Sequence, residues 1–222
     1  MKIGVFDSGI GGLALAEHLK NTFPDHTIIT AHDRKNVPYG TKSPMIIIQL
    51  TDRAIQCLLK EHCRIIVIAC NTATAVAIEF LRKKYPDTLF VGLEPMLKDA
   101  AALTKTNVVT LCATPTTLAS ERYLSQKKLY SHVNIIEPDC SQWATMIEHN
   151  EMNTKIIQQT IRHALEQNAD VIILGCTHYH WIEDDIQQIV GKSVRVIQPS
   201  DAISRRVAGL LAQIDPLDLD SQ

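Results

Sequence analysis

The sequence lacks the features that mark membrane, secreted and nucleic-acid-binding proteins. None of its apolar runs approaches the roughly 20 residues needed to cross a bilayer, and the start MKIGVFDSGIGG lacks the apolar core of a signal peptide. The formal net charge is only −2, and the basic clusters at 82–84 and 127–128 are short. We therefore expect a cytoplasmic protein that binds neither nucleic acid nor a membrane surface.

The cysteines do not form the pattern of a disulfide-stabilised protein. There are six, at positions 57, 63, 70, 112, 140 and 176, and none belongs to a CxxC pair. In a reducing compartment these thiols stay free and can serve as acids and bases. The 222 residues, 45% of them apolar, are enough for one large α/β domain or two small lobes, each with its own core.

Two similar stretches, RIIVIACNTATA (64–75) and DVIILGCTHYH (170–180), organise the chain. Each is an apolar, β-branched run that stops at a cysteine, Cys70 or Cys176, and continues through polar residues toward a helix. Such runs are typical of strands buried on both faces of a parallel sheet, and ligands of these sheets bind beyond the carboxyl ends of the strands. We predict that the two thiols face each other across one cleft.

The pattern of strands and helices occurs twice. Asp7 lies 63 residues before Cys70, and Thr114 lies 62 residues before Cys176. This predicts an α/β fold of two similar Rossmann-like lobes with parallel sheets, related by a pseudo-twofold axis, with the active site between them. The expected lobes are 1–95 plus 203–222, which carries Cys70, and 96–202, which carries Cys176. Strands are expected at 3–6, 27–31, 65–69, 89–91, 107–112, 133–136, 171–175 and 194–197, and the longer helices include 43–61, one ending near 127, and 182–190.

Two facing thiols suit the inversion of an α-carbon. One group removes the proton, and the other returns a proton to the opposite face of the planar carbon. An ordinary cysteine pKa lies roughly one to two units from working pH, and a helix N-terminus can lower it. Asp7 could orient the first thiol, and His178 offers another group that handles protons. Small polar side chains near the strand ends could hold the substrate and stabilise its carbanion: Ser8, Asn71, Thr72, Thr114, Thr117 and Thr177.

Six motifs resemble, in order and approximate spacing, those of the cofactor-independent glutamate racemases. They are DSGIGG, PYG, ACNTATA, Glu94-Pro95, ATPTTLAS with Tyr123, and GCTHY. The resemblance implies that Cys70 acts on the D-enantiomer and Cys176 on the L-enantiomer, with no cofactor and no metal. It further implies a homodimer in the bacterial cytosol that supplies D-glutamate for peptidoglycan. The assisting residues implied are Asp7, His178 and Glu148, and the implied substrate contacts are Asp7, Ser8, Tyr39, Gly40, Asn71, Thr72, Thr114, Thr117, Thr177 and His178.

The chain departs from this family at three places. Asn36 stands where the family usually has arginine, two residues before PYG, and His180 replaces the proline of CTHYP. The sequence also stops soon after Ala212, where the family usually adds several dozen residues that complete the first lobe.

The same residues are compatible with other functions. An aspartate or broad-specificity amino-acid racemase would use the same chemistry, and a shortened homologue could bind or regulate without catalysis. The Cys176–His180 stretch could hold zinc only with a second ligand cluster. The turn 9–12, with Asp33 after the second strand, imitates a dinucleotide site but lacks the GxGxxG pattern.

Overall fold

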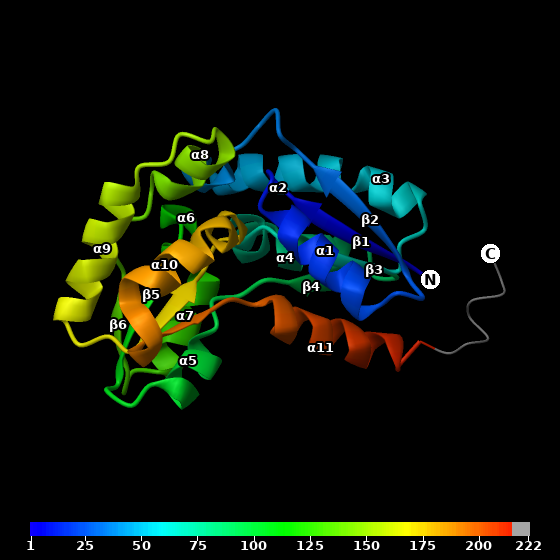
Figure 1. Ribbon diagram of the computed structural model, residues 1–222. Helices are drawn as coiled ribbons and strands as arrows, with labels where there is room; N and C mark the ends of the chain where they lie inside the picture. Colours follow the sequence, from blue (N-terminus) through cyan, green and yellow to red (C-terminus); the bar gives the residue numbers. More distant parts are fainter. Residues whose placement is uncertain (215–222) are drawn as a thin grey trace.

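A computed structural model describes residues 1–214, which form two four-stranded parallel sheets covered by helices (Figure 1). The strand order is β2-β1-β3-β4 in the first sheet and β6-β5-β7-β8 in the second, so the same topology occurs twice. The predicted two-lobed α/β fold is confirmed. The first lobe contains β1 (Lys2–Asp7), α1 (Gly12–Thr22), β2 (Thr27–His32), η1 (Tyr39–Thr41), α2 (Pro44–Ala54), α3 (Gln56–Lys60), β3 (Ile65–Ile68), α4 (Asn71–Lys84) and β4 (Leu89–Gly92).

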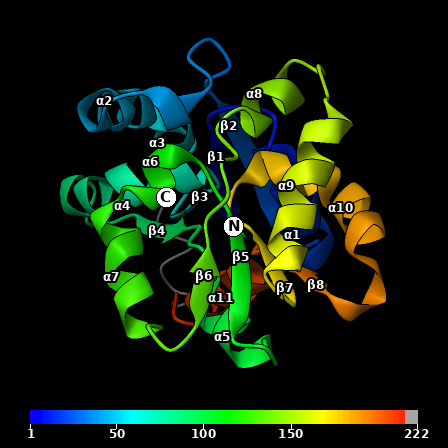
Figure 2. The same cartoon turned by 90° about the vertical axis from the view of Figure 1, so that its left-hand side faces the viewer.

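The second lobe repeats this strand order. Its elements are α5 (Leu97–Leu103), β5 (Val108–Cys112), α6 (Pro115–Leu118), α7 (Glu121–Leu129), β6 (Asn134–Ile136), α8 (Trp143–Glu148), α9 (Thr154–Glu166), β7 (Val171–Leu174), η2 (Thr177–Ile182), α10 (Glu183–Val190), η3 (Gly191–Ser193) and β8 (Arg195–Ile197). Helices α9 and α10 cover one face of its sheet, and α5 and α7 cover the other (Figure 2).

Strands β3 and β7 are apolar at every position because both faces of each sheet are covered. In β3, Ile66 packs in the core under α2 and α4, whereas its neighbour Val67 packs in the core under α1. In β7, Ile172 and Ile173 likewise enter different cores. Successive side chains of one strand point to opposite faces of the sheet, so an uninterrupted apolar run contributes to two cores.

The last helix, α11 (Ser200–Leu211), leaves the second sheet and packs on the first lobe (Figure 1). Its residues Ile203, Val207 and Leu210 share a core with Leu15 of α1 and Val91 of β4. The expected return of the final helix to the first lobe is seen for this segment. Residues 215–222, which the sequence assigned to the same lobe, lie outside the described residues. No helix in residues 1–214 is long and apolar enough to span a bilayer.

Three predicted helices have different boundaries in the structure. The helix expected over 43–61 is two helices that meet at Ile55, with no glycine or proline to mark the break. The helix expected to run to residue 127 is also two, because the Ser120 hydroxyl accepts the Tyr123 amide N–H and starts α7 anew. Helix α10 begins at Glu183, since 177–182 form a 3-10 helix.

Candidate active site

The carboxyl ends of the central strands of both sheets meet at one buried cavity. In the first sheet the chain runs from β1 to β2 in one direction and from β3 to β4 in the other, and β5 and β7 diverge in the same way in the second sheet. Folds of this type bind ligands in the crevice between two such diverging strands. The cavity has a volume of about 20 Å³, enough for about one water molecule, so the lobes are closed over it and must part to admit an amino acid. Its lining residues are Ser8, Val37, Pro38, Tyr39, Gly40, Cys70, Asn71, Thr72, Thr114, Ala144, Cys176, Thr177 and His178.

Cys70 caps α4 from the first lobe. Its Sγ accepts the Ala73 amide N–H and the Ser8 hydroxyl, each at 3.4 Å. These donors favour the thiolate, as expected at a helix N-terminus. Burial nevertheless raises the pKa of the thiol to about 11, and the charge of Asp7 adds to the rise. In the cavity the effect of burial outweighs these donors, so the pKa of the Cys70 thiol lies above its ordinary value and the neutral form is favoured.

This raised pKa predicts a loss of stability at alkaline pH. Between the ordinary thiol pKa of 9.0 and the folded-state pKa of about 11, the folded chain holds more protons than the unfolded chain. The contribution is fully present below pH 9 and is lost as pH rises toward 11, on the order of 1 kcal/mol per unit of pKa shift. Denaturant unfolding across this window measures it. Cys70→Ser should show a shallower decline, and an unchanged slope would contradict the assignment.

Cys176 begins a row of three side chains in the second lobe. Its Sγ lies 3.8 Å from Nδ1 of His178, whose Nε2 lies 2.6 Å from Oε2 of Glu148. The same Glu148 oxygen accepts the amide N–H of Ile10 from the first lobe at 3.0 Å. Burial raises the pKa of the Cys176 thiol, and the nearby Cys70 adds to the rise. The row therefore places an imidazole beside Cys176, and the Glu148 carboxylate that contacts this imidazole also binds the first lobe.

Asp7 connects the two lobes from behind the cavity wall. Its Oδ1 accepts the Gly9 amide N–H at 2.7 Å, and its Oδ2 accepts the Thr177 hydroxyl of the second lobe at 2.8 Å. The side chain is fully buried, and this burial raises its pKa, although the nearby His178 and the hydrogen bonds from Gly9 and Thr177 act to lower it. Asp7 thus orders the ends of β1 and β7 against each other.

Hydroxyl and amide groups complete the polar surface of the site. The Oγ1 atoms of Thr72 and Thr114 lie 2.9 Å apart across the lobe boundary, and Thr117 continues the row at 2.9 Å from Thr114. Asn71 is buried, and neither its Nδ2 nor its Oδ1 has a hydrogen-bond partner within residues 1–214. An unpaired buried amide is costly, so the site favours a ligand that offers both a donor and an acceptor.

All the site residues predicted from the sequence gather here. Ten of them line the cavity, while Asp7, Thr117 and Glu148 lie one hydrogen bond behind its wall. Three other lining residues, Val37, Pro38 and Ala144, are not among the predicted site residues. Ala144 could have been predicted from the sequence, because it lies four residues before Glu148 on α8 and therefore on the same face of the helix.

The glycine-rich turn is a contact between lobes. A Cβ at Gly9 would lie 2.3 Å from Oε2 of Glu148, and one at Gly11 would lie 2.6 Å from the backbone N of His178. The turn therefore packs directly against the second lobe, whereas the corresponding turn of a dinucleotide site leaves room for phosphates. Among residues 1–214, no three His, Cys, Asp or Glu side chains are grouped to hold a metal ion.

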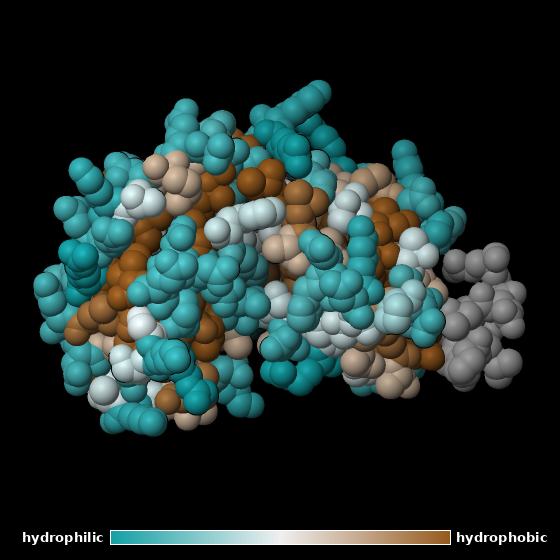
Figure 3. Space-filling model, viewed as in Figure 1, coloured by the Kyte–Doolittle hydropathy of each residue, from teal (hydrophilic) through white to brown (hydrophobic). Residues whose placement is uncertain are grey.

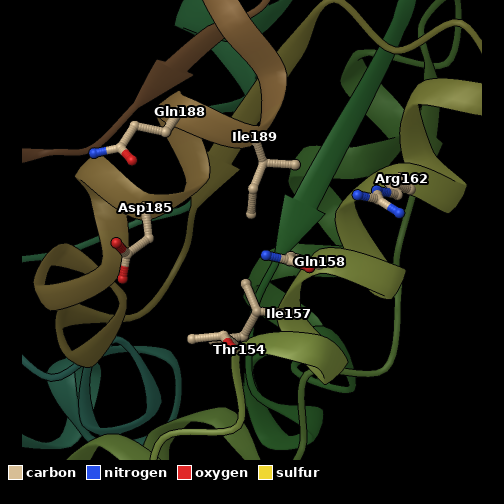
Figure 4. A pocket seen from close by; sticks show the side chains of 7 residues that line it. All are labelled: Thr154, Ile157, Gln158, Arg162, Asp185, Gln188 and Ile189. Atoms are coloured by element: carbon tan, nitrogen blue, oxygen red, sulfur yellow. The ribbon is translucent and has the colours of Figure 1, made fainter.

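A larger surface groove lies elsewhere, between α9 and α10 (Figure 4). It has a volume of about 430 Å³ and a partly apolar floor that includes Ile157 and Ile189. Brown apolar surface is visible among the teal in this part of the molecule (Figure 3). Its lining residues include no thiol and no imidazole, so size alone does not identify the reactive site.

Two similar α/β lobes that each bring one thiol to a shared cavity are the arrangement of an amino-acid racemase. The chain matches the Asp/Glu/Hydantoin racemase family over residues 13–207 and belongs to that family.

Within the family, its close relatives are glutamate racemases, which confirms the resemblance seen in the motifs. The chain is 36% identical to glutamate racemase of Aliarcobacter butzleri over 218 residues, 95% of this chain and 84% of that protein. It is 37% identical to that of Clostridium perfringens over 210 residues, 92% and 81% of the two chains. The structure of Escherichia coli glutamate racemase in complex with L-glutamate and the activator UDP-MurNAc-Ala superposes on this chain with a TM-score of 0.86 at 29% sequence identity. The superposition covers 97% of this chain and 84% of the Escherichia coli chain.

Proposed function

We propose that this protein is a glutamate racemase that interconverts L- and D-glutamate without a cofactor, using Cys70 and Cys176 as its acid–base pair. The observation that carries the proposal is the placement of one buried thiol from each lobe in the wall of a single cavity. Relatives named as glutamate racemases support the choice of substrate.

The reaction needs one thiolate and one thiol at a time. With L-glutamate, the Cys176 thiolate takes the α-proton as the C–H bond breaks, and Cys70 gives its proton to the opposite face of the planar carbon. Cys176 is then the thiol and Cys70 the thiolate, and the reverse reaction starts from that state. With D-glutamate the two residues exchange roles, as in the family.

Neighbouring groups adjust each thiol. The Ser8 hydroxyl and the Ala73 amide stabilise a thiolate at Cys70, and His178, held by Glu148, exchanges a proton with Cys176. Opening the lobes exposes the thiols to water, which removes the desolvation that keeps them neutral. Closure then surrounds the developing carbanion with preorganised donors. We assign substrate contacts to Asp7, Ser8, Tyr39, Gly40, Asn71, Thr72, Thr114, Thr117, Thr177 and His178.

Proton NMR in D₂O tests the function. L-Glutamate incubated with the purified protein, with no cofactor added, should lose its α-proton signal while the D-enantiomer appears. L-Aspartate, shorter by one methylene, should react more slowly. Faster turnover of aspartate would replace the substrate by aspartate or a broader set of amino acids. Absence of exchange with both would favour a binding or regulatory homologue.

The cellular role follows from the reaction. We propose that the product D-glutamate serves peptidoglycan synthesis in the cytoplasm, where reduced thiols persist and all six cysteines of this chain are free. From the family resemblance we also propose a homodimer, which light scattering of the purified protein would measure. We propose the lobe boundaries 1–95 plus 203–222 and 96–202, supported by the packing of α11 on the first lobe.

A further inference from the structure

Tyr39 lines the cavity but directs its hydroxyl away from it. The hydroxyl donates to Oδ2 of Asp33 at 2.7 Å, just beyond the end of β2. The ring is 1% exposed and packs near Phe6, with 6.3 Å between ring centroids. The side chain is therefore fixed at both ends, by apolar packing at the ring and by a carboxylate at the hydroxyl.

Asp33 is the centre of a small network in the loop 33–40. Its two carboxylate oxygens accept Nδ2 of Asn36 at 2.8 and 3.0 Å, and its carbonyl accepts the Asn36 amide N–H at 3.0 Å. The Asp33 amide N–H donates to the carbonyl of Asp7 at 3.4 Å. The loop is thus tied to the end of β1. Asn36 thus satisfies both oxygens of Asp33 with a neutral donor.

The wall formed by this loop also touches the second lobe. The carbonyl of Gly40 accepts the Thr116 hydroxyl at 2.6 Å, and a Cβ at Gly40 would lie 3.1 Å from Cβ of Thr114. A small displacement of Tyr39 would therefore move both the cavity wall and a contact that closes the lobes.

The charge of Asp33 has a second consequence. Together with burial, it raises the pKa of Tyr39 far above its usual range, so the phenol stays neutral beside the cavity. A phenolate there would repel a thiolate at Cys70 and the carboxylates of an acidic substrate.

We infer that Asp33 is a positioning residue for racemisation, acting through Tyr39 to hold the wall 37–40 in the geometry that binds the substrate and meets Thr116. The inference rests on the proposed function. A group that holds a binding wall contributes to ground-state and transition-state binding alike, so its loss raises KM more than it lowers kcat.

A double-mutant cycle tests the inference. Asp33→Asn keeps the side-chain size but offers one acceptor oxygen where the structure uses two, and Tyr39→Phe removes the donor. Each should raise KM for glutamate roughly tenfold, the size expected for losing a charge-assisted hydrogen bond. Since Asp33 acts through Tyr39, the double variant should match the more affected single variant. Asp87→Asn, the same change on an exposed residue between α4 and β4, should leave KM unchanged.

The outcomes separate the inference from the proposed function. If the wild-type enzyme racemises glutamate, either of two results would overturn the role of Asp33. One is a KM increase in the double variant equal to the product of the two single increases, and the other is an unchanged KM in Asp33→Asn. A wild-type protein that racemises no amino acid would overturn both. A merely structural role would lower the unfolding temperature of Asp33→Asn without the non-additive change in KM, and would also overturn the inference.

Discussion

Cys70→Ser and Cys176→Ser are each expected to lower kcat/KM for glutamate racemisation by roughly 10²–10⁴-fold, the range supplied by a positioned acid or base. A serine hydroxyl occupies nearly the same space as a thiol but ionises far less readily, so the variant keeps the packing and loses the proton transfer. Steady-state rates in both directions, followed by circular dichroism or chiral chromatography, measure the loss.

The remaining thiol predicts an asymmetry between the two variants. Cys70→Ser retains Cys176, the proposed base for L-glutamate, so slow α-proton exchange in D₂O should survive for that enantiomer. Cys176→Ser should show residual exchange for D-glutamate. The reverse pattern would contradict the assignment of each cysteine to its enantiomer.

Cys63→Ser is the matched control. Cys63 is also buried, at 3% exposure, and burial raises its pKa to about 11, but it lies in the first-lobe core and does not line the cavity. Its replacement should leave kcat/KM within a few-fold of wild type. A comparable loss in Cys63→Ser would mean that thiol removal acts through folding, and retained activity in Cys70→Ser would refute the two-thiol mechanism.

The overall fold was predictable because buried parallel strands have an unambiguous pattern. The run IIVI of β3 is apolar at every position, and β7 repeats this with VIIL. Helix boundaries were less predictable. The break at Ile55 has no local signal, and the one at Ser120 depends on a single capping hydroxyl inside an otherwise helical pattern.

The site was predictable where strand ends determine position, as for Cys70 and Cys176. The direction in which the thiol pKa values shift was not predictable from the sequence, because the shift depends on how completely the lobes exclude water. Contacts between the lobes could not be predicted from the sequence either. Thr116 and Gly40, for example, are 76 positions apart, and no sequence pattern links them. The role of Asp33 likewise depends on where the Tyr39 hydroxyl points.

Gly11→Ala is expected to lower kcat/KM by about a hundredfold while leaving the chain folded. The backbone of Gly11 has φ −57° and ψ −37°, which alanine adopts without strain. The cost arises across the lobe boundary, where the added Cβ would lie 2.6 Å from both the His178 amide nitrogen and the Thr177 Oγ1. Backbone atoms there cannot move without moving His178 itself, and a displacement of about 1 Å in a reactive group can cost a factor of 10².

Gly209→Ala separates closure from folding. Gly209 lies in α11 with nothing within 4 Å of an added Cβ, so alanine should stabilise the helix by about 0.5–1 kcal/mol and leave activity unchanged. If Gly11→Ala loses activity at an unchanged unfolding temperature, the deficit lies in bringing the lobes together, because the first lobe alone tolerates the methyl group. Wild-type activity in Gly11→Ala would instead show that the reaction proceeds with the lobes further apart, and the alignment of His178 with Glu148 seen here would not be required for turnover.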